Sequence, residues 1–191
     1  SYYSALWKRG IDTDIIGAED CFDGYRLIIA PMRYSVSAAL GEKLKKFVEN
    51  GGTLLFTYIS AMVNENDLCY LGGFPGAGLG EVFGIWNEEI DTLYPGEKNS
   101  VKLGDEEYTA TDYCELIHTN TAEVLAVYSQ DFYSGMPALT VNKYGKGRAY
   151  YQAFRDEGAF TDRLVSQLLK ECSIGSVFDG ELPEGVTAHG R

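Results

Sequence analysis

The spacing of apolar and polar residues predicts five elements in the first 60 residues. They are a helix at 2–9, a short strand at 11–16, a strand at 25–31, a helix at 35–52 and a strand at 53–60. The run at 25–31 is almost entirely apolar, which is typical of a strand buried on both faces in a parallel sheet. Ser35 or Ser37 can cap the following helix at its start, and Gly51 can end it. The alternation favours an α/β fold over a β-sandwich or a helical bundle.

The second half of the chain is predicted to be rich in strands. Short alternating runs at 99–103, 106–111, 113–119 and 123–128 are separated by turn residues, and together indicate a β-rich excursion from the α/β pattern. Two strands then flank the turn "KYGKG", where Gly145 and Gly147 are expected to supply positive φ angles. An apolar stripe with helical spacing predicts a closing helix at 159–172.

We expect residues 1–175 to form one domain and residues 176–191 to form a linker. The tail is polar and rich in glycine and proline, so it is a poor candidate for packing and is expected to lead into a further, missing β domain. The chain starts with Ser1, without a methionine, and enters a helical pattern at once. This start suggests a fragment of a longer protein.

The charge and cysteine pattern narrow the classes of partner. The net charge of −12 at pH 7 argues against binding to nucleic acid or to anionic membranes. No apolar run approaches the ~20 residues that span a bilayer, so a soluble, cytoplasmic protein is expected. The cysteines at 21, 69, 114 and 172 form no CxxC pair. They are predicted to be buried free thiols, and no metal site is expected.

The glycine-rich stretch "GGFPGAGLG" at 72–80 raises the question of a phosphate-binding loop. A phosphate loop needs a lysine and then a serine or threonine after its last glycine, but here Leu79 and Gly80 follow Gly78. The dinucleotide pattern also fails because Glu81 would repel a pyrophosphate. The sequence therefore predicts no nucleotide and no other cofactor.

The end of the strand at 53–60 is where an α/β enzyme would carry a nucleophile. A glutaminase-like elbow, G-x-C-x-G, aligns here as Thr57-x-Ile59-x-Ala61, which places an inert isoleucine at the nucleophile position. Ser60 is the local alternative and would need a base such as His118 or His189. His118 is more simply a strand or turn residue, and the many Asp and Glu residues are expected to form a solvated acidic face.

Three long stretches together resemble one known family. They are "YYSALWKRGIDTDII", the run from "YRLIIAP" to "EVFGI", and "MPALTVNKYGKGRAYYQAF", with "ISAMVNENDLCYLGGFPG" as the most specific segment. They are similar to the middle, trimerisation domain of family-42 glycoside hydrolases, which are bacterial β-galactosidases. The resemblance implies a flavodoxin-like, class I glutamine-amidotransferase-like three-layer α/β sandwich between an N-terminal (β/α)8 barrel and a C-terminal β domain.

The resemblance also implies that this chain has no catalytic or metal-binding residue, because the family's two catalytic glutamates and its four-cysteine zinc site belong to the barrel. We therefore expect an oligomerisation domain of a homotrimeric β-galactosidase whose β-galactoside substrate is bound by the absent barrel. Two alternatives stay open, an amidotransferase-like hydrolase that uses Ser60 or an unconventional cysteine, and a flavodoxin-like module that binds flavin or nucleotide.

The expected subunit contact lies at 62–76, close to a neighbouring barrel's sugar-binding cleft. Its candidate residues are polar and aromatic: Asn64, Glu65, Asn66, Asp67, Tyr70, Phe74 and Pro75. Aromatic residues are enriched at protein interfaces, and glycine permits close backbone approach. Phe83 and Trp86 extend the same predicted aromatic cluster.

Overall fold

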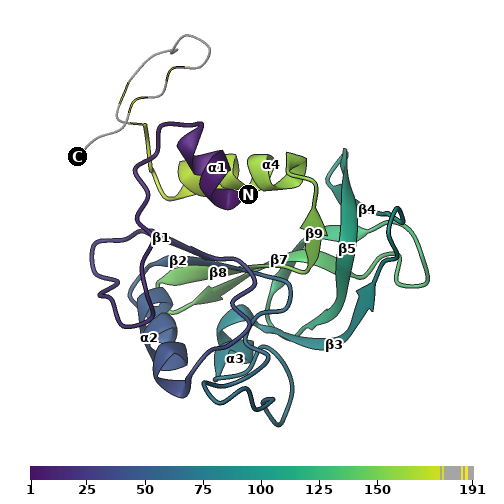
Figure 1. Ribbon diagram of the computed structural model, residues 1–191, viewed down its shortest axis with the longest axis horizontal. Helices are drawn as coiled ribbons and strands as arrows, with labels where there is room; N and C mark the ends of the chain where they lie inside the picture. Colours follow the sequence, from purple (N-terminus) through teal and green to yellow (C-terminus); the bar gives the residue numbers. More distant parts are fainter. Residues whose placement is uncertain (177, 179–185, 187, 189–191) are drawn as a thin grey trace. The chain divides into compact units, whose positions relative to one another are not determined.

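The structure is a computed structural model that describes residues 1–176, 178, 186 and 188 (Figure 1). The chain divides into two compact units, one of residues 22–157 and one that joins residues 1–21 to residues 158–191. The predicted linker at 176–191 falls almost wholly outside the described residues.

The unit of residues 22–157 is built on a nine-stranded mixed sheet. Its strands are β1 (Leu27–Ala30), β2 (Thr53–Thr57), β3 (Ile85–Thr92), β4 (Asn99–Leu103), β5 (Glu106–Thr119), β6 (Glu123–Tyr128), β7 (Pro137–Tyr144), β8 (Gly147–Gln152) and β9 (Phe154–Asp156). The order is β1-β2-β8-β7-β6-β4-β5-β3, with β9 beside β5. Strands β1, β2 and β8 are parallel and the other pairings are antiparallel. The predicted α/β pattern with a β-rich second half is confirmed.

Strand β1 is less buried than its apolar sequence predicts. All four of its residues are only half-buried, because β1 is the edge strand of the sheet and pairs only with β2. The prediction of a parallel strand is therefore right, and the prediction of burial on both faces is wrong.

Helices α2 (Ala38–Glu49) and α3 (Leu79–Phe83) cover one face of this sheet (Figure 1). The Ser37 hydroxyl accepts a hydrogen bond from the Leu40 N–H at 3.1 Å and caps α2, so Ser37 and not Ser35 is the cap. A side chain at Gly41 would place its Cβ 2.4 Å from the Ala77 carbonyl oxygen. The glycine therefore allows α2 to lie directly against the loop that precedes α3.

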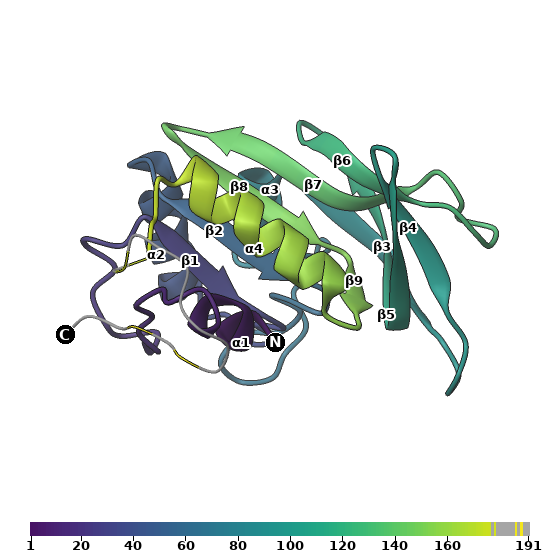
Figure 2. The ribbon, with the colours of Figure 1, turned by 90° about the horizontal axis from the view of Figure 1, so that it is seen from above.

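The antiparallel strands close into a small ring (Figure 2). Strand β8 pairs with β7, β7 with β6, β6 with β4 and β4 with β5, and β5 then pairs with β9, which follows β8 after one residue. Buried rings meet here, with Tyr128 centred 5.1 Å from Tyr133, which lies between β6 and β7, and 6.3 Å from Phe154 on β9. The two strands predicted at 106–111 and 113–119 are one long strand, β5, because different parts of it pair with β4, β9 and β3.

The hairpin between β7 and β8 uses its two glycines differently. Gly145 has the predicted positive φ, at 57°, but Gly147 does not. A Cβ on Gly147 would lie 2.2 Å from the Gly52 carbonyl oxygen. Gly147 is therefore needed for close packing and not for the turn conformation.

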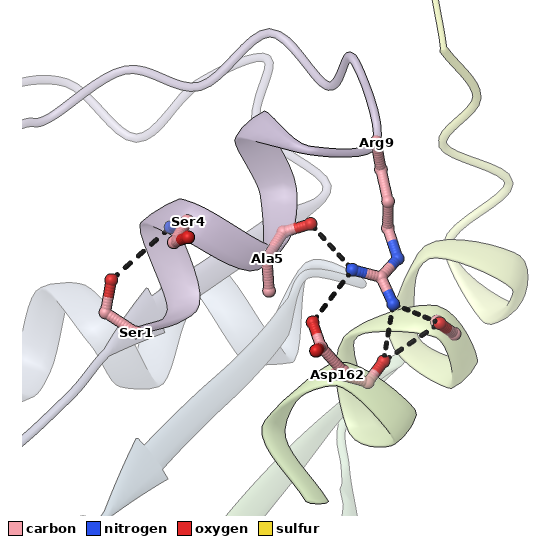
Figure 3. Close-up of polar contacts among 6 residues, drawn as sticks. Ser1, Ser4, Ala5, Arg9 and Asp162 are labelled. Carbon is pink, nitrogen blue, oxygen red and sulfur yellow. Dashed lines mark hydrogen bonds and ion pairs between the residues drawn. The ribbon is translucent and has the colours of Figure 1, made fainter. Parts of the chain in front are cut away.

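The second unit contains helices α1 (Tyr2–Trp7) and α4 (Ala159–Glu171). The Arg9 guanidinium joins them, because Nη1 donates to the Ala5 carbonyl at 2.8 Å and to Asp162 Oδ1 at 3.1 Å (Figure 3). Its Nη2 donates to the Asp162 carbonyl and to Ser166 Oγ, both at 3.0 Å. None of the helices in the described part of the chain is long and apolar enough to cross a membrane.

The strand predicted at 11–16 does not form. The Ile11 N–H donates to the Leu6 carbonyl, which turns the chain back on α1, and the Ile15 side chain is exposed. The predicted apolar stripe of α4 is confirmed, since Phe160, Leu164, Val165, Leu168 and Leu169 are all buried.

Candidate functional site

A sharp turn follows β2, at the position where the sequence predicted a degenerate nucleophile. Ile59 has a φ of 55° there. This left-handed conformation costs an L-residue about 1–2 kcal/mol, and a β-branched residue adopts it rarely. The turn is tied to the segment after β1, since the Met32 N–H donates to Thr57 Oγ1 at 2.8 Å and the Arg33 N–H donates to Ser60 Oγ at 3.0 Å.

The Ile59 N–H of this turn is held by Glu115, which is in turn held by a second buried side chain, Tyr151. The Ile59 N–H donates to Glu115 Oε1 at 2.8 Å, and the Tyr151 hydroxyl donates to Glu115 Oε2 at 2.7 Å. Glu115 and Tyr151 lie on β5 and β8, so the turn is fixed by two strands of the sheet.

Burial raises the pKa of Glu115 to about 7, and its hydrogen bonds with Ile59 and Tyr151 offset only part of that rise. The side chain is fully buried. The prediction that the acidic residues form a solvated face is therefore wrong at this position. A buried carboxyl with no cation beside it favours its neutral form, because the charged form loses its hydration.

The chain after the turn continues the parallel pairing beyond the ends of β1 and β2. The Ala61 N–H donates to the Arg33 carbonyl at 2.8 Å, and the Met62 N–H donates to the Tyr34 carbonyl at 2.9 Å. The Val36 N–H then donates to the Val63 carbonyl at 2.9 Å. These bonds fix where the segment 64–76 leaves the sheet.

Asn64 organises the first half of that segment. Its Oδ1 accepts hydrogen bonds from the N–H groups of Asn66 at 2.9 Å and Leu68 at 3.1 Å. Its carbonyl accepts from Ser35 Oγ at 2.9 Å. The neighbouring candidates Glu65, Asn66 and Asp67 are exposed on the turn that Asn64 closes.

Tyr70 organises the second half. Its hydroxyl donates to the Val36 carbonyl at 2.5 Å, and its ring lies over Gly76, whose N–H donates to the Ala61 carbonyl at 2.8 Å. Phe74 is half-buried, and its carbonyl accepts from the Asn87 N–H at 2.9 Å. Pro75 follows a cis peptide bond and is buried.

The segment also carries large apolar side chains in solvent. Leu68 is 62% exposed and Leu71 is 100% exposed. The sequence-based prediction did not single them out. A signal was present, because Leu71 is an apolar residue between Tyr70 and two glycines, outside any helical or strand period.

The sequence-based prediction also missed Glu115, although it is the one acidic residue in the apolar run "CELI".

The predicted aromatic cluster is divided by the fold. Phe83 is fully buried against Phe56, with ring centroids 4.9 Å apart, so it belongs to the core and not to an interface. Trp86 is 43% exposed and stacks on His118 at 4.2 Å between ring centroids. His118 Nε2 lies 2.5 Å from Glu88 Oε2. His118 therefore belongs to this surface cluster, whereas Ser60, which it was considered to activate, is fully buried.

Three backbone N–H groups of the glycine-rich loop are bonded within the protein. Those of Gly76, Leu79 and Gly80 donate to the carbonyls of Ala61, Gly76 and Pro75. Within the described residues, no group of three or more His, Cys, Asp and Glu side chains is placed to hold a metal ion.

The four cysteines differ in their exposure. Cys114 is buried as predicted, but Cys21 and Cys69 are exposed and Cys172 is partly exposed, so the prediction that all four thiols are buried is wrong.

Comparison with known proteins points to one family over almost the whole chain. The sequence profile of the β-galactosidase trimerisation domain matches residues 1–175. A β-galactosidase of Clostridium perfringens is 47% identical over the whole chain, and one of Alicyclobacillus acidocaldarius is 45% identical over 98% of it. The chain spans about 28% of the length of both relatives.

Solved structures agree with the sequence comparison. The crystal structure of a β-galactosidase from Rahnella sp. R3 matches 97% of the chain with a TM-score of 0.93 and 46% identity. That of a β-galactosidase from Bacillus circulans sp. alkalophilus matches 93% with a TM-score of 0.90 and 42% identity. The matched region is 28% and 27% of those chains.

Proposed function

Because the chain belongs to the β-galactosidase trimerisation domain family, we propose that it is the oligomerisation domain of a longer, cytoplasmic β-galactosidase. In this proposal the parent enzyme assembles as a homotrimer and hydrolyses terminal β-D-galactosides. The substrate is bound by parts of the enzyme outside this chain, and the domain alone is inert. The match of the family profile to residues 1–175 carries the proposal.

Within this domain we assign the subunit contact to residues 62–76, which we call the contact loop. Two observations support the assignment. Leu68 and Leu71 place apolar surface in water on a loop that is held by backbone and side-chain hydrogen bonds. An ordered apolar projection of this kind is typical of a surface that another protein covers. Asn64, Glu65, Asn66 and Asp67 would form the polar rim beside it.

The finer description of the fold is also part of the proposal. We assign the parallel strands β1, β2 and β8, with α2, to a flavodoxin-like or class I glutamine-amidotransferase-like three-layer sandwich. The left-handed conformation of Ile59 after β2 supports this assignment, because nucleophile elbows are sharp, strained turns at the end of a strand. In this assignment Ile59 occupies the position that the nucleophilic cysteine has in an active elbow.

The test replaces single side chains of the contact loop in a full-length β-galactosidase that carries this domain. Leu71→Glu should shift the mass measured by light scattering from trimer toward monomer, because a charge would replace an apolar contact. Phe74→Ala should lower the trimer fraction or the turnover of an aryl galactoside. Leu71 is fully exposed, so its substitution leaves the fold of the domain intact.

Phe132 provides the matched control. It is a large apolar residue, 78% exposed on another loop of the same unit. Phe132→Glu and Phe132→Ala should keep the trimer mass and the turnover of the parent enzyme. Unchanged mass and kinetics in both contact-loop variants would refute the assignment of residues 62–76.

A further inference from the structure

The turn after β2 is held in an unfavourable conformation by groups that are distant in sequence. Ile59 lies in the left-handed region, which persists only where the surrounding structure imposes it. Its N–H donates to Glu115, 56 positions away, and Glu115 is itself held by the Tyr151 hydroxyl. In an active elbow, the N–H after the nucleophile faces the substrate oxyanion. Here the residue after Ile59 is Ser60, which is fully buried.

We propose that Glu115 is a positioning residue that holds the Ile59 turn and thereby sets the direction in which the contact loop leaves the sheet. The contact loop begins three residues after Ile59. Its role in assembly rests on the proposed function, whereas its placement by Glu115 follows from the hydrogen bonds of the turn itself.

The geometry explains why a carboxyl suits this position. Its two oxygens reach two different elements at once, since Oε1 accepts from the Ile59 N–H at 2.8 Å and Oε2 lies 2.7 Å from the Tyr151 hydroxyl. An apolar side chain of the same size would leave a buried N–H without a partner, which costs about 1–3 kcal/mol. Glu115 therefore ties the turn after β2 to β5 and β8, three residues before the contact loop begins.

The side chains that face Glu115 carry no charge that could stabilise its ionised form. The protonation state of Glu115 itself therefore decides how firmly it holds the turn. They are Tyr151 on β8, Tyr128 on β6 with its hydroxyl 3.1 Å from the Glu115 carbonyl, and Asn87 on β3. The ion pairs within the described residues do not include Glu115. Burial raises its pKa, so ionisation is easier when the turn opens to water. The turn should therefore open more readily as the pH rises.

The test is hydrogen exchange of a full-length β-galactosidase that carries this domain. Protection of peptides covering 57–76 is compared with that of peptides covering 123–144, after correction for the intrinsic exchange rate at each pH. For the wild type, linkage with a pKa near 7 predicts that protection of 57–76 falls about tenfold between pH 6 and pH 8. Protection of 123–144 should change much less.

Two substitutions separate positioning from general stability. Glu115→Gln keeps an acceptor oxygen but cannot ionise, so it should keep the protection of 57–76 and abolish its pH dependence. Glu115→Leu removes the acceptor and should lower that protection at every pH. Tyr151→Phe, which keeps the ring, should lower it less because the carboxyl remains on Ile59.

The proposal is overturned if Glu115→Leu leaves residues 57–76 as protected as in the wild type, or lowers the protection of 123–144 equally. It is also overturned if Glu115→Gln keeps the wild-type pH dependence. The trimer mass of the same variants is a separate readout. Loss of loop protection with an unchanged trimer would support the positioning role and refute the subunit-contact role of the loop.

Discussion

The ring of Tyr70 covers Gly76 so closely that a Cβ added to Gly76 would stand 2.0 Å from Cδ2 of the ring. Only five residues lie between the two, so the contact loop folds back on itself at this point. The same tyrosine reaches the Val36 carbonyl with its hydroxyl. Position 76 therefore has room only for glycine, because any larger residue would displace the Tyr70 ring that anchors the loop.

We predict that Gly76→Ala destabilises the protein by about 1–3 kcal/mol, the range for overpacking a close-packed site. Urea unfolding followed by circular dichroism measures the change. Gly175→Ala is the control, since nothing lies within 4 Å of a Cβ placed there, and it should leave the midpoint nearly unchanged. Equal midpoints for wild type and Gly76→Ala would contradict the packing of Tyr70 on Gly76.

Asn64→Ala should loosen the turn at 64–68. The substitution removes the oxygen that accepts from the N–H groups of Asn66 and Leu68, at a cost of about 1 kcal/mol. Limited proteolysis should then cut the loop faster. Asn64→Asp keeps an acceptor oxygen and should resist cleavage like the wild type, so rapid cleavage of both variants would argue against this role of Asn64.

The free energy of unfolding should decrease as the pH rises from 5 to 8. The pKa of Glu115 is raised from 4.5 to about 7 in the folded state, so between these values the folded protein binds more protons than the unfolded one. The stabilisation is complete below pH 4.5 and is lost as the pH passes 7. The contribution over this range is about 2–3 kcal/mol.

The measurement is the difference in unfolding free energy between wild type and Glu115→Gln at several pH values, since the other titrating groups are common to both. Relative to Glu115→Gln, the wild type should be more stable at pH 5 than at pH 8. A constant difference across the range would mean that Glu115 has an ordinary pKa.

Arg9→Ala should weaken the attachment of α1 to α4. The guanidinium binds Asp162 through its carboxylate and its carbonyl, and it also binds Ala5 and Ser166. The ion pair is partly exposed to solvent, so we expect a loss of only about 1 kcal/mol, which is smaller at high salt. Thermal unfolding at two salt concentrations tests this, and the exposed neighbour Lys8→Ala is the control.

Much of the fold could be predicted from neighbouring residues. The cap at Ser37, the stripe of α4 and the hairpin turn at Gly145 each depend on groups a few positions apart. The missing lysine after Gly78 was enough to reject a phosphate loop. These features follow from local hydrogen bonding and from helical and strand periods, which can be recognised from residues a few positions apart.

The candidate site depends on contacts between residues that are far apart in the sequence. The sequence by itself determined the α/β pattern, the strand-rich second half and the inert Ile59 at the end of β2. Only the tertiary structure decided that Glu115 is buried against Ile59, that Phe83 is core while Trp86 is surface, and that Leu71 projects into solvent. The physical reason is that burial and the pairing of buried polar groups are set by residues brought together from distant parts of the chain.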